Sequence, residues 1–320
     1  MRTITLRRSL VALFAAAISF GAITQAQAET LRIGYQKYGT LVLLKAKGSL
    51  EKRLANKGIE VQWTEFPGGP QLLEGLNVGS IDFGTTGEAP PIFAQAAGAD
   101  LLYVAHEPPA PTSEAILVPK DSSIKSVAEL KGKKVALNKG SNVHYLLVRA
   151  LEDAGLQYSD IQPVYLPPAD ARAAFERGSV DAWVIWDPFQ AAAEHQLQAR
   201  SLRDGQGLVA NHQFYLAAKP YALQNPEVVS VLVEEVRGIG EWTRANSAEA
   251  TAQVAPLLGL SPAITRTAVE RQAYGAQFIS PEVVEAQQQI ADTFSDLKLI
   301  PKRLTIKDVI WAPPAKVAQQ

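Results

Sequence analysis

The chain has 320 residues and is almost electrically balanced, with 31 Lys and Arg against 32 Asp and Glu. A nucleic-acid-binding protein needs a dense basic surface, so this composition argues against that class. Hydrophobic residues make up 47% of the chain and charged residues 20%, which indicates a folded protein with one large core or two smaller ones.

Strands and helices are predicted to alternate through the first two thirds of the chain. We expect strands at 31–35, 59–66, 81–84, 101–105, 115–118, 134–137, 164–165 and 180–185, separated by helices at 41–54, 70–78, 89–97, 143–154 and 169–177. Beyond about Tyr221 the pattern is mainly helical, at 227–245, 248–258, 262–272 and 281–297. The alternation predicts an α/β fold with largely parallel sheets, and we expect the last helices to pack on the first part.

Residues 1–28 have the pattern of a secretory signal peptide. Three Arg among the first eight residues precede an uncharged apolar stretch over 10–23, and 26–28 supply small residues for a signal peptidase. The apolar stretch is short for a transmembrane span. We therefore predict cleavage after Ala28 and export to the periplasm, by either the general secretory or the twin-arginine route.

Sulfur is nearly absent from the sequence. There is no Cys, and Met1 is the only Met, although a core of this size ordinarily uses several Met side chains as gap-fillers. One interpretation is that the protein is made when sulfur is scarce, as part of a system that acquires sulfur. The other is chance or a bias in genomic composition.

An internal repeat divides the α/β part into two similar units. Residues 76–82 are echoed by 175–181, 99 positions later, and each copy leads into a short predicted strand, a polar turn and a helix. Residues 37–40 correspond in the same way to 138–141. The pattern favours a duplicated unit over two unrelated units that share a common turn.

Four predicted helix starts could together hold an anion. In open α/β sheets ligands bind beyond the carboxyl ends of the strands, where free N–H groups and the helix dipole attract negative charge. Hydroxyl and Gly residues at these turns suit such a site, although plain helix capping would also explain them. The candidate ligand-binding residues are Lys37, Tyr38, Gly39, Thr40, Leu41, Thr86, Gly87, Glu88, Gly140, Ser141, Asn142, Trp186 and Asp187.

Charged and aromatic members of this set have specific expected roles. Lys37 is the one cation at a candidate turn. Glu88 and Asp187 would orient donors, contact a cationic part of a ligand, or only cap helices. Trp186 would supply an apolar wall and an indole donor.

No catalytic or metal-binding pattern is present. The four His residues lack metal-ligand spacing, and there is no Cys nucleophile, no Gly-x-Ser-x-Gly elbow and no phosphate-binding loop. We therefore expect no metal, no cofactor and no enzymatic activity.

Several long segments resemble the aliphatic-sulfonate-binding proteins of bacterial ABC importers. The resemblance covers essentially the whole chain after residue 28 and is carried by segments 33–37, 65–71, 79–84, 90–96, 168–172 and 182–188. It implies a type II periplasmic binding fold, with two α/β lobes, two crossovers and a ligand cleft between the lobes. The expected lobes are 29–112 plus 213–320, and 113–212.

The same resemblance implies a function and its partners. We expect a monomer that captures an alkanesulfonate and delivers it to an ABC-importer membrane permease for sulfur acquisition, with the ligand's apolar tail beside Trp186 and Leu41 or Phe189. Relatives with this fold bind taurine, nitrate or bicarbonate, so another small oxyanion or sulfur compound, such as a sulfate ester, is an alternative. An enzyme of the thiamin-pyrimidine synthase type and a sensory binding domain are further alternatives.

Overall fold

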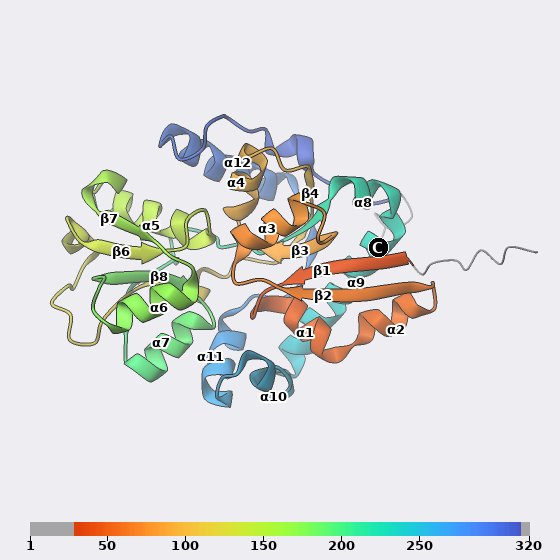
Figure 1. The fold of residues 1–320 in the computed structure, drawn as a ribbon, viewed down its shortest axis with the longest axis horizontal. Helices are drawn as coiled ribbons and strands as arrows, with labels where there is room; N and C mark the ends of the chain where they lie inside the picture. Colours follow the sequence, from red (N-terminus) through yellow and green to blue (C-terminus); the bar gives the residue numbers. More distant parts are fainter. Residues whose placement is uncertain (1–28, 315–320) are drawn as a thin grey trace, which may run out of the picture.

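The computed structural model describes residues 29–314, which form two mixed α/β units side by side (Figure 1). The predicted signal peptide and its cleavage site lie outside these residues. The first sheet has the strand order β11-β4-β10-β3-β1-β2, and the second has the order β7-β6-β8-β5-β9. In the first sheet the strands are β1 (Glu29–Tyr35), β2 (Ile59–Glu65), β3 (Phe83–Thr86), β4 (Leu101–His106), β10 (Phe214–Ala218) and β11 (Gln277–Phe278). In the second they are β5 (Glu114–Val118), β6 (Lys134–Leu137), β7 (Gln162–Tyr165), β8 (Ala182–Trp186) and β9 (Arg200–Asp204).

Helices follow most of the strands, as the alternation predicts. The first unit, built on the first sheet, contains α1 (Gly39–Lys47), α2 (Ser49–Ala55), α3 (Gly69–Asn77) and α4 (Pro90–Ala96). The second unit, built on the second sheet, contains α5 (Asn142–Asp153), α6 (Pro168–Glu176) and α7 (Phe189–Leu197). The last part of the chain forms α8 (Lys219–Gln224), α9 (Pro226–Ala245), α10 (Ser247–Leu258), α11 (Pro262–Arg271) and α12 (Pro281–Asp296).

Three expectations about these elements are wrong. The helix expected over 41–54 is two helices, because Gly48 takes a left-handed conformation with φ 63° and interrupts the turn. The sheets are mixed rather than largely parallel, since β10 is antiparallel to β3 and β4, and β5 is antiparallel to β8 and β9. The strand expected at 81–84 begins two residues later, at Phe83.

The chain passes between the two sheets twice. It leaves the first sheet after β4 and enters the second at β5, then returns from β9 to β10. The predicted lobe boundaries, at 112/113 and 212/213, fall in these two connections. The division into lobes that move separately stays a prediction.

The internal repeat has the same local structure in both units. Asp82 accepts a hydrogen bond from the backbone N–H of Arg32 at 2.8 Å, and Asp181, 99 positions later, accepts one from the N–H of Lys134 at 2.8 Å. In each unit this contact ties one strand, at Arg32 of β1 or Lys134 of β6, to the turn before its parallel neighbour. The two copies of the repeat therefore form the same contact beside equivalent pairs of parallel strands, β1 with β3 and β6 with β8.

The C-terminal helices do not all pack on the first unit, contrary to the expectation from the sequence. Helices α9 and α10 contact α1, but α11 lies against α7 of the second unit, where Ile264 and Ala268 meet Ala191 and Ala192. Phe294 of α12 contacts aromatic side chains from both units. These helices therefore brace the two units, with α10 and α11 below the junction and α12 above it in Figure 1.

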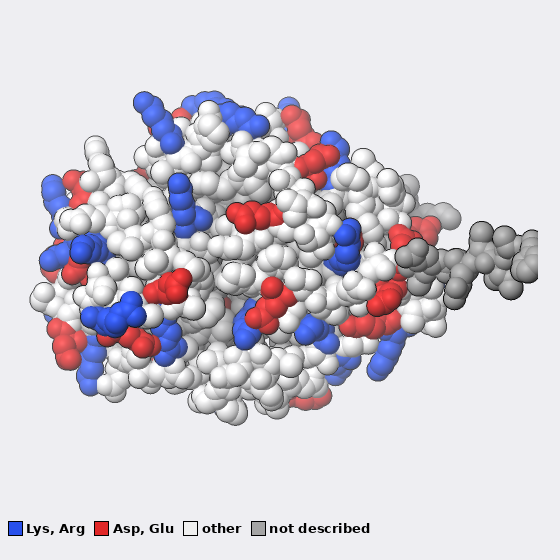
Figure 2. Space-filling view, in the orientation of Figure 1, with Lys and Arg blue, Asp and Glu red and all other residues white. Residues whose placement is uncertain are grey.

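The surface agrees with the balanced composition. On the face shown in Figure 2, charged side chains of both signs are dispersed and no basic field forms. Within residues 29–314, no helix combines the length and apolarity needed to span a membrane.

Candidate functional site

The carboxyl ends of strands from both sheets meet at the junction of the units. A Cβ atom placed on Gly68 would lie 2.7 Å from Asn138 Nδ2, which follows β6, and 3.7 Å from Trp186 Cη2 at the end of β8. One placed on Gly69 would lie 3.1 Å from Thr86 Cβ at the end of β3. Only glycine fits at the start of α3 in this arrangement, and the backbone there approaches both sheets.

Polar atoms without protein partners gather at this point. Asn138 is 7% exposed, and its Nδ2 has no hydrogen-bond partner within residues 29–314. Gln71 Oε1 is likewise unpartnered there and would lie 3.0 Å from a Cβ atom on Gly68. A buried polar group without a partner is costly, so this pair indicates a place where a ligand completes the hydrogen bonds.

Two helices point uncapped N-termini toward this region. Helix α3 begins after Gly68 and helix α5 begins after Ser141, and no side chain caps either helix. No side chain occupies the first N–H groups of either helix, although Pro70 of α3 has no N–H and that of His144 in α5 donates to the Ser141 carbonyl at 3.0 Å. Each helix dipole contributes partial positive charge. The arrangement can hold an anion with backbone dipoles and a side-chain amide.

An apolar cleft of about 230 Å³ adjoins the candidate anion site. Aromatic and proline side chains from both units form most of its wall, and among the described residues that line it only Lys37 and Glu65 are charged. Their charged atoms are 3.6 Å apart and both side chains are nearly half exposed, at 44% and 45%. The remaining lining residues are Gln36, Tyr38, Phe66, Pro67, Pro167, Pro168, Ala169, Trp186, Pro188 and Phe189.

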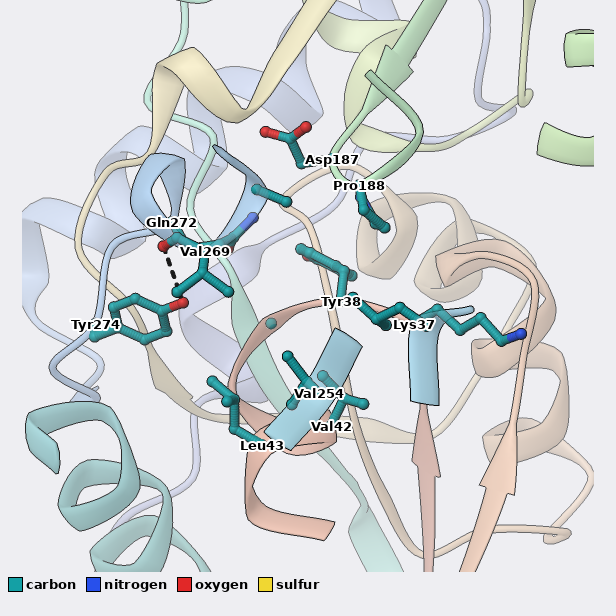
Figure 3. Close-up of a pocket in the computed structure, with 13 residues that line it drawn as sticks. Lys37, Tyr38, Val42, Leu43, Asp187, Pro188, Val254, Val269, Gln272 and Tyr274 are labelled. Atoms are coloured by element: carbon teal, nitrogen blue, oxygen red, sulfur yellow. Dashed lines mark hydrogen bonds between the residues drawn. The ribbon is translucent and has the colours of Figure 1, made fainter. Parts of the chain in front are cut away.

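A second, much smaller cavity, of about 20 Å³, is also bordered by Tyr38 and Pro188 (Figure 3). Six of its thirteen lining residues are aliphatic side chains of α1, α10 and α11. Across it, the hydroxyl of Tyr274 donates to the carbonyl of Val269 at 3.1 Å. Lys37, Tyr38 and Pro188 line both cavities and separate them.

The first predicted turn, residues 37–41, contributes side chains at the edge of the cleft, but its Thr40 hydroxyl is not a free donor. Lys37 and Tyr38 line the cleft, whereas Gly39 faces only the second cavity. The hydroxyl of Thr40 donates to Glu107 at 2.8 Å, so its proton is already used. Leu41 is fully buried in the core of the first unit and lines neither cavity, so the candidate site leaves it out.

The turns before α4 and α5 face each other across the units. A Cβ atom on Gly87 would lie 2.7 Å from Asn142 Cβ, so Gly87 allows this close approach. The hydroxyl of Thr86 donates to the Gly87 carbonyl at 2.9 Å, and that of Ser141 donates to the Asn138 carbonyl at 2.7 Å. These hydroxyls can accept but not donate further hydrogen bonds while those contacts last.

Gly140 and Gly39 occupy equivalent places in the repeat. Their φ angles are 75° and 76°, a left-handed conformation that favours glycine. The N–H of Gly140 donates to His144 Nδ1 at 3.2 Å, which turns this N–H away from the site. Burial lowers the pKa of His144 to about 3, so this imidazole is neutral and lends the site no charge.

The two predicted carboxylates are buried, and each keeps one oxygen without a hydrogen-bond partner within residues 29–314. Asp187 Oδ1 accepts from the Ala191 N–H at 2.9 Å and so caps α7, and Arg271 lies 3.5 Å away. Burial raises the pKa of Asp187 to about 7 and that of Glu88 to about 7. The helix begins at Phe189 rather than at Pro188, but the capping role expected for Asp187 is present.

Trp186 lies in the wall of the cleft, 4% exposed and edge-to-face with Phe189 at 6.1 Å between ring centroids. Trp183, three residues earlier, packs against Phe175 in the core.

Sequence reasoning missed Gln71 and Asn138. The internal repeat offered a signal that these segments line the site. The backbone N–H of Phe66 donates to the carbonyl of Tyr35 at the end of β1, and that of Leu166 donates to the carbonyl of Leu137 at the end of β6. Both segments continue into prolines that line the cleft.

No group of three potential metal ligands occurs within residues 29–314. The site offers helix N-termini and amides, which suit an anion better than a cation. Of residues 29–314, Lys37 at its rim is the one basic side chain that lines the cleft.

Comparison with known proteins places the chain in a family. The family model described as NMT1/THI5 like matches residues 54–250. The chain belongs to this family. It is also 48% identical over 297 residues to the putative aliphatic sulfonates-binding protein of Escherichia coli (strain K12), covering 92% of each protein. A Bacillus subtilis (strain 168) protein of the same description is 32% identical, covering 89% of this chain and 86% of the relative.

A solved structure supports the same grouping. The alkanesulfonate-binding protein SsuA from Xanthomonas axonopodis pv. citri, bound to MOPS, matches with a TM-score of 0.86 and 44% identity, covering 89% of this chain and 99% of that chain. The expected fold is confirmed: this member of the NMT1/THI5-like family has the two-unit architecture of periplasmic binding proteins. The relatives named here are described as binding proteins.

Proposed function

We propose that this protein captures aliphatic sulfonates in the periplasm and delivers them to the membrane permease of an ABC importer. The observation that carries the proposal is an anion site made of dipoles and amides beside an apolar cleft. The relatives described as sulfonate-binding proteins support it, as does the scarcity of sulfur in the sequence.

The chemistry of a sulfonate matches each part of the site. A sulfonate carries one permanent negative charge spread over three oxygens, which the Asn138 amide and the N-termini of α3 and α5 can receive. A hydrogen bond to a charged group contributes about 1.5–3 kcal/mol, so a few such bonds hold the anion without a cation. The tail then lies along Trp186 and Phe189 in the cleft.

Contact between the units around the candidate site could distinguish a closed, ligand-bound form from an open one, and the permease would recognise the closed form. Gly68 approaches Asn138, and Gly87 approaches Asn142, so residues of the first unit touch residues of the second around the candidate site. We infer that ligand binding closes the units by bending at the two connections, and that the closed form is the one delivered. We also infer that the exported protein begins at Glu29 and acts as a monomer.

Calorimetry with the exported form tests this function. The protein is dialysed into a buffer without a sulfonate group and titrated with methanesulfonate, pentanesulfonate, taurine, sulfate and nitrate. We expect tight binding of the alkanesulfonates and much weaker binding of sulfate and nitrate. Tight nitrate binding without heat from the alkanesulfonates would overturn the proposal, and a clear preference for taurine would reassign the ligand.

A further inference from the structure

An ion pair of Lys37 and Glu65 forms part of the wall of the cleft. Lys37 Nζ lies 3.6 Å from Glu65 Oε1, which is longer than a hydrogen bond, so the two groups attract each other without being joined. Both residues line the cleft and both side chains are nearly half exposed. A ligand that lies in the cleft can therefore reach either charge.

The carboxylate of this pair is held in place, whereas the amine is free to move. Glu65 is the last residue of β2, and its Oε2 accepts from the Tyr35 hydroxyl at 3.3 Å. That hydroxyl in turn accepts from Lys45 Nζ at 3.1 Å. Lys37 lies between β1 and α1 on a flexible side chain, which Figure 3 shows extended with its amine turned away from the second cavity. Another cation can therefore take the place of the Lys37 amine beside Glu65.

The rest of the wall suits a cation better than a second anion. The aromatic rings of Tyr38, Phe66, Trp186 and Phe189 line the same cleft. Aromatic faces carry partial negative charge and attract ammonium groups. A carboxylate beside such rings is therefore suited to a protonated amine.

Trp186 connects this part of the cleft with the candidate anion site. Its Cη2 lies 3.7 Å from the Cβ position of Gly68, and the same Cβ position lies 2.7 Å from Asn138 Nδ2. Trp186 also lines the cleft together with Lys37 and Glu65. A tail that starts at the anion site and runs along Trp186 therefore enters the space that the ion pair borders.

We propose that Glu65 receives a protonated amine at the far end of the ligand's tail, so that the cleft takes aminoalkanesulfonates as well as plain alkanesulfonates. The inference rests on the proposed function and extends its class of ligands. With a plain alkyl tail, Lys37 stays beside Glu65 and offsets its charge. With an ammonium tail, the ligand's amine replaces that of Lys37.

The expected effect is modest because water reaches both charges. Ion pairs with this degree of exposure change an equilibrium by about twofold to fivefold, and we expect about threefold here. A comparison of ligands of equal size is needed to measure such a change.

Two matched pairs of ligands provide that comparison. 3-Aminopropanesulfonate and butanesulfonate share the sulfonate and the chain length but end in an ammonium or a methyl group. 4-Aminobutanesulfonate and pentanesulfonate form a longer pair, so that one fixed tail length does not decide the result. Calorimetry at pH 7, where a primary amine is protonated, gives the ratio of amino to alkyl affinity for each pair. Any effect on the shared sulfonate cancels in this ratio.

Three variants give different expected ratios. Glu65→Gln removes the acceptor of the amine, so the ratio should fall about threefold in at least one pair. Lys37→Gln removes the competing cation, so the ratio should rise about threefold. Glu60→Gln is the control, because Glu60 is exposed at the other end of β2 and does not line the cleft; its ratio should equal that of wild-type protein.

The outcomes separate the two proposals. Wild-type protein that binds neither butanesulfonate nor pentanesulfonate would refute the proposed function. Wild-type protein that binds these but neither aminoalkanesulfonate would refute the amine site alone, as would unchanged ratios for both pairs in Glu65→Gln. Equal falls in Glu65→Gln and Glu60→Gln would also refute it, because the effect would then come from overall charge. A fall in Lys37→Gln would refute the exchange of one amine for the other.

Discussion

Replacing Trp186 with Ala tests whether the cleft holds the ligand's tail. The indole forms one wall of the cleft beside Phe189, so an alkyl chain in the cleft would contact it along one side. Burying a methylene contributes about 0.8 kcal/mol, and losing contact on one side would remove about half of that. Over the four methylenes that separate pentanesulfonate from methanesulfonate, the difference is about 1.6 kcal/mol, or about fifteenfold in affinity.

Trp183→Ala is the matched control for this measurement. Trp183 lies on the same strand but packs against Phe175 in the core, and its loss should cost about 3–5 kcal/mol of unfolding free energy. Its effect on affinity should not depend on the length of the tail. Trp186→Ala also loses stability, because this side chain is only 4% exposed, so the ratio of the two affinities is the decisive quantity. Equal losses for methanesulfonate and pentanesulfonate in Trp186→Ala would refute the tail assignment.

Three further substitutions test other parts of the argument. Asn138→Ala should weaken the binding of every sulfonate about tenfold or more, as measured by calorimetry. The melting temperature should change little, because Asn138 Nδ2 has no protein partner to lose. A large drop in melting temperature with intact affinity would contradict this. Glu88 keeps its proton in the folded protein up to about pH 7, whereas the unfolded chain loses it near 4.5, so folding stability should fall by about 3 kcal/mol as pH rises between those values. Urea titrations should show a flatter pH dependence in Glu88→Gln, and an unchanged slope would exclude Glu88 as the source. Arg271→Ala should cost about 2–3 kcal/mol in thermal unfolding, because it leaves Asp187 buried without its cation, and Arg271→Lys should recover part of the loss.

The sequence predicted those elements whose signal is local. Strand β6 is found at 134–137 as expected, and the four long C-terminal helices lie within one or two residues of their predicted ranges. Strand β9 was missed because Arg200–Asp204 is mostly polar at the edge of its sheet and lacks an apolar alternation. Strand β10 returns antiparallel between β3 and β4, an arrangement that depends on partners more than 100 residues away.

The candidate site was predictable only in outline. Helix starts at strand ends could be located from Gly and hydroxyl residues, and the repeat showed that they come in pairs. Which polar groups remain free depends on distant contacts: Glu107, 67 positions from Thr40, occupies the Thr40 hydroxyl. Asn138 matters because Gly68 approaches it from the other unit, and no local pattern reveals that approach.

The hydrophobic core has a consequence for how the protein unfolds. One continuous cluster includes Leu72 and Ile92 of the first unit, Val135 and Leu146 of the second, and Phe294 of α12. Separating the units would expose apolar surface on both, so each half of the protein depends on the other for its stability. Heating should therefore melt the two units together in one cooperative transition, even though their sheets are separate. The closure proposed above would have to occur within this shared core, while α12 stays in contact with both units.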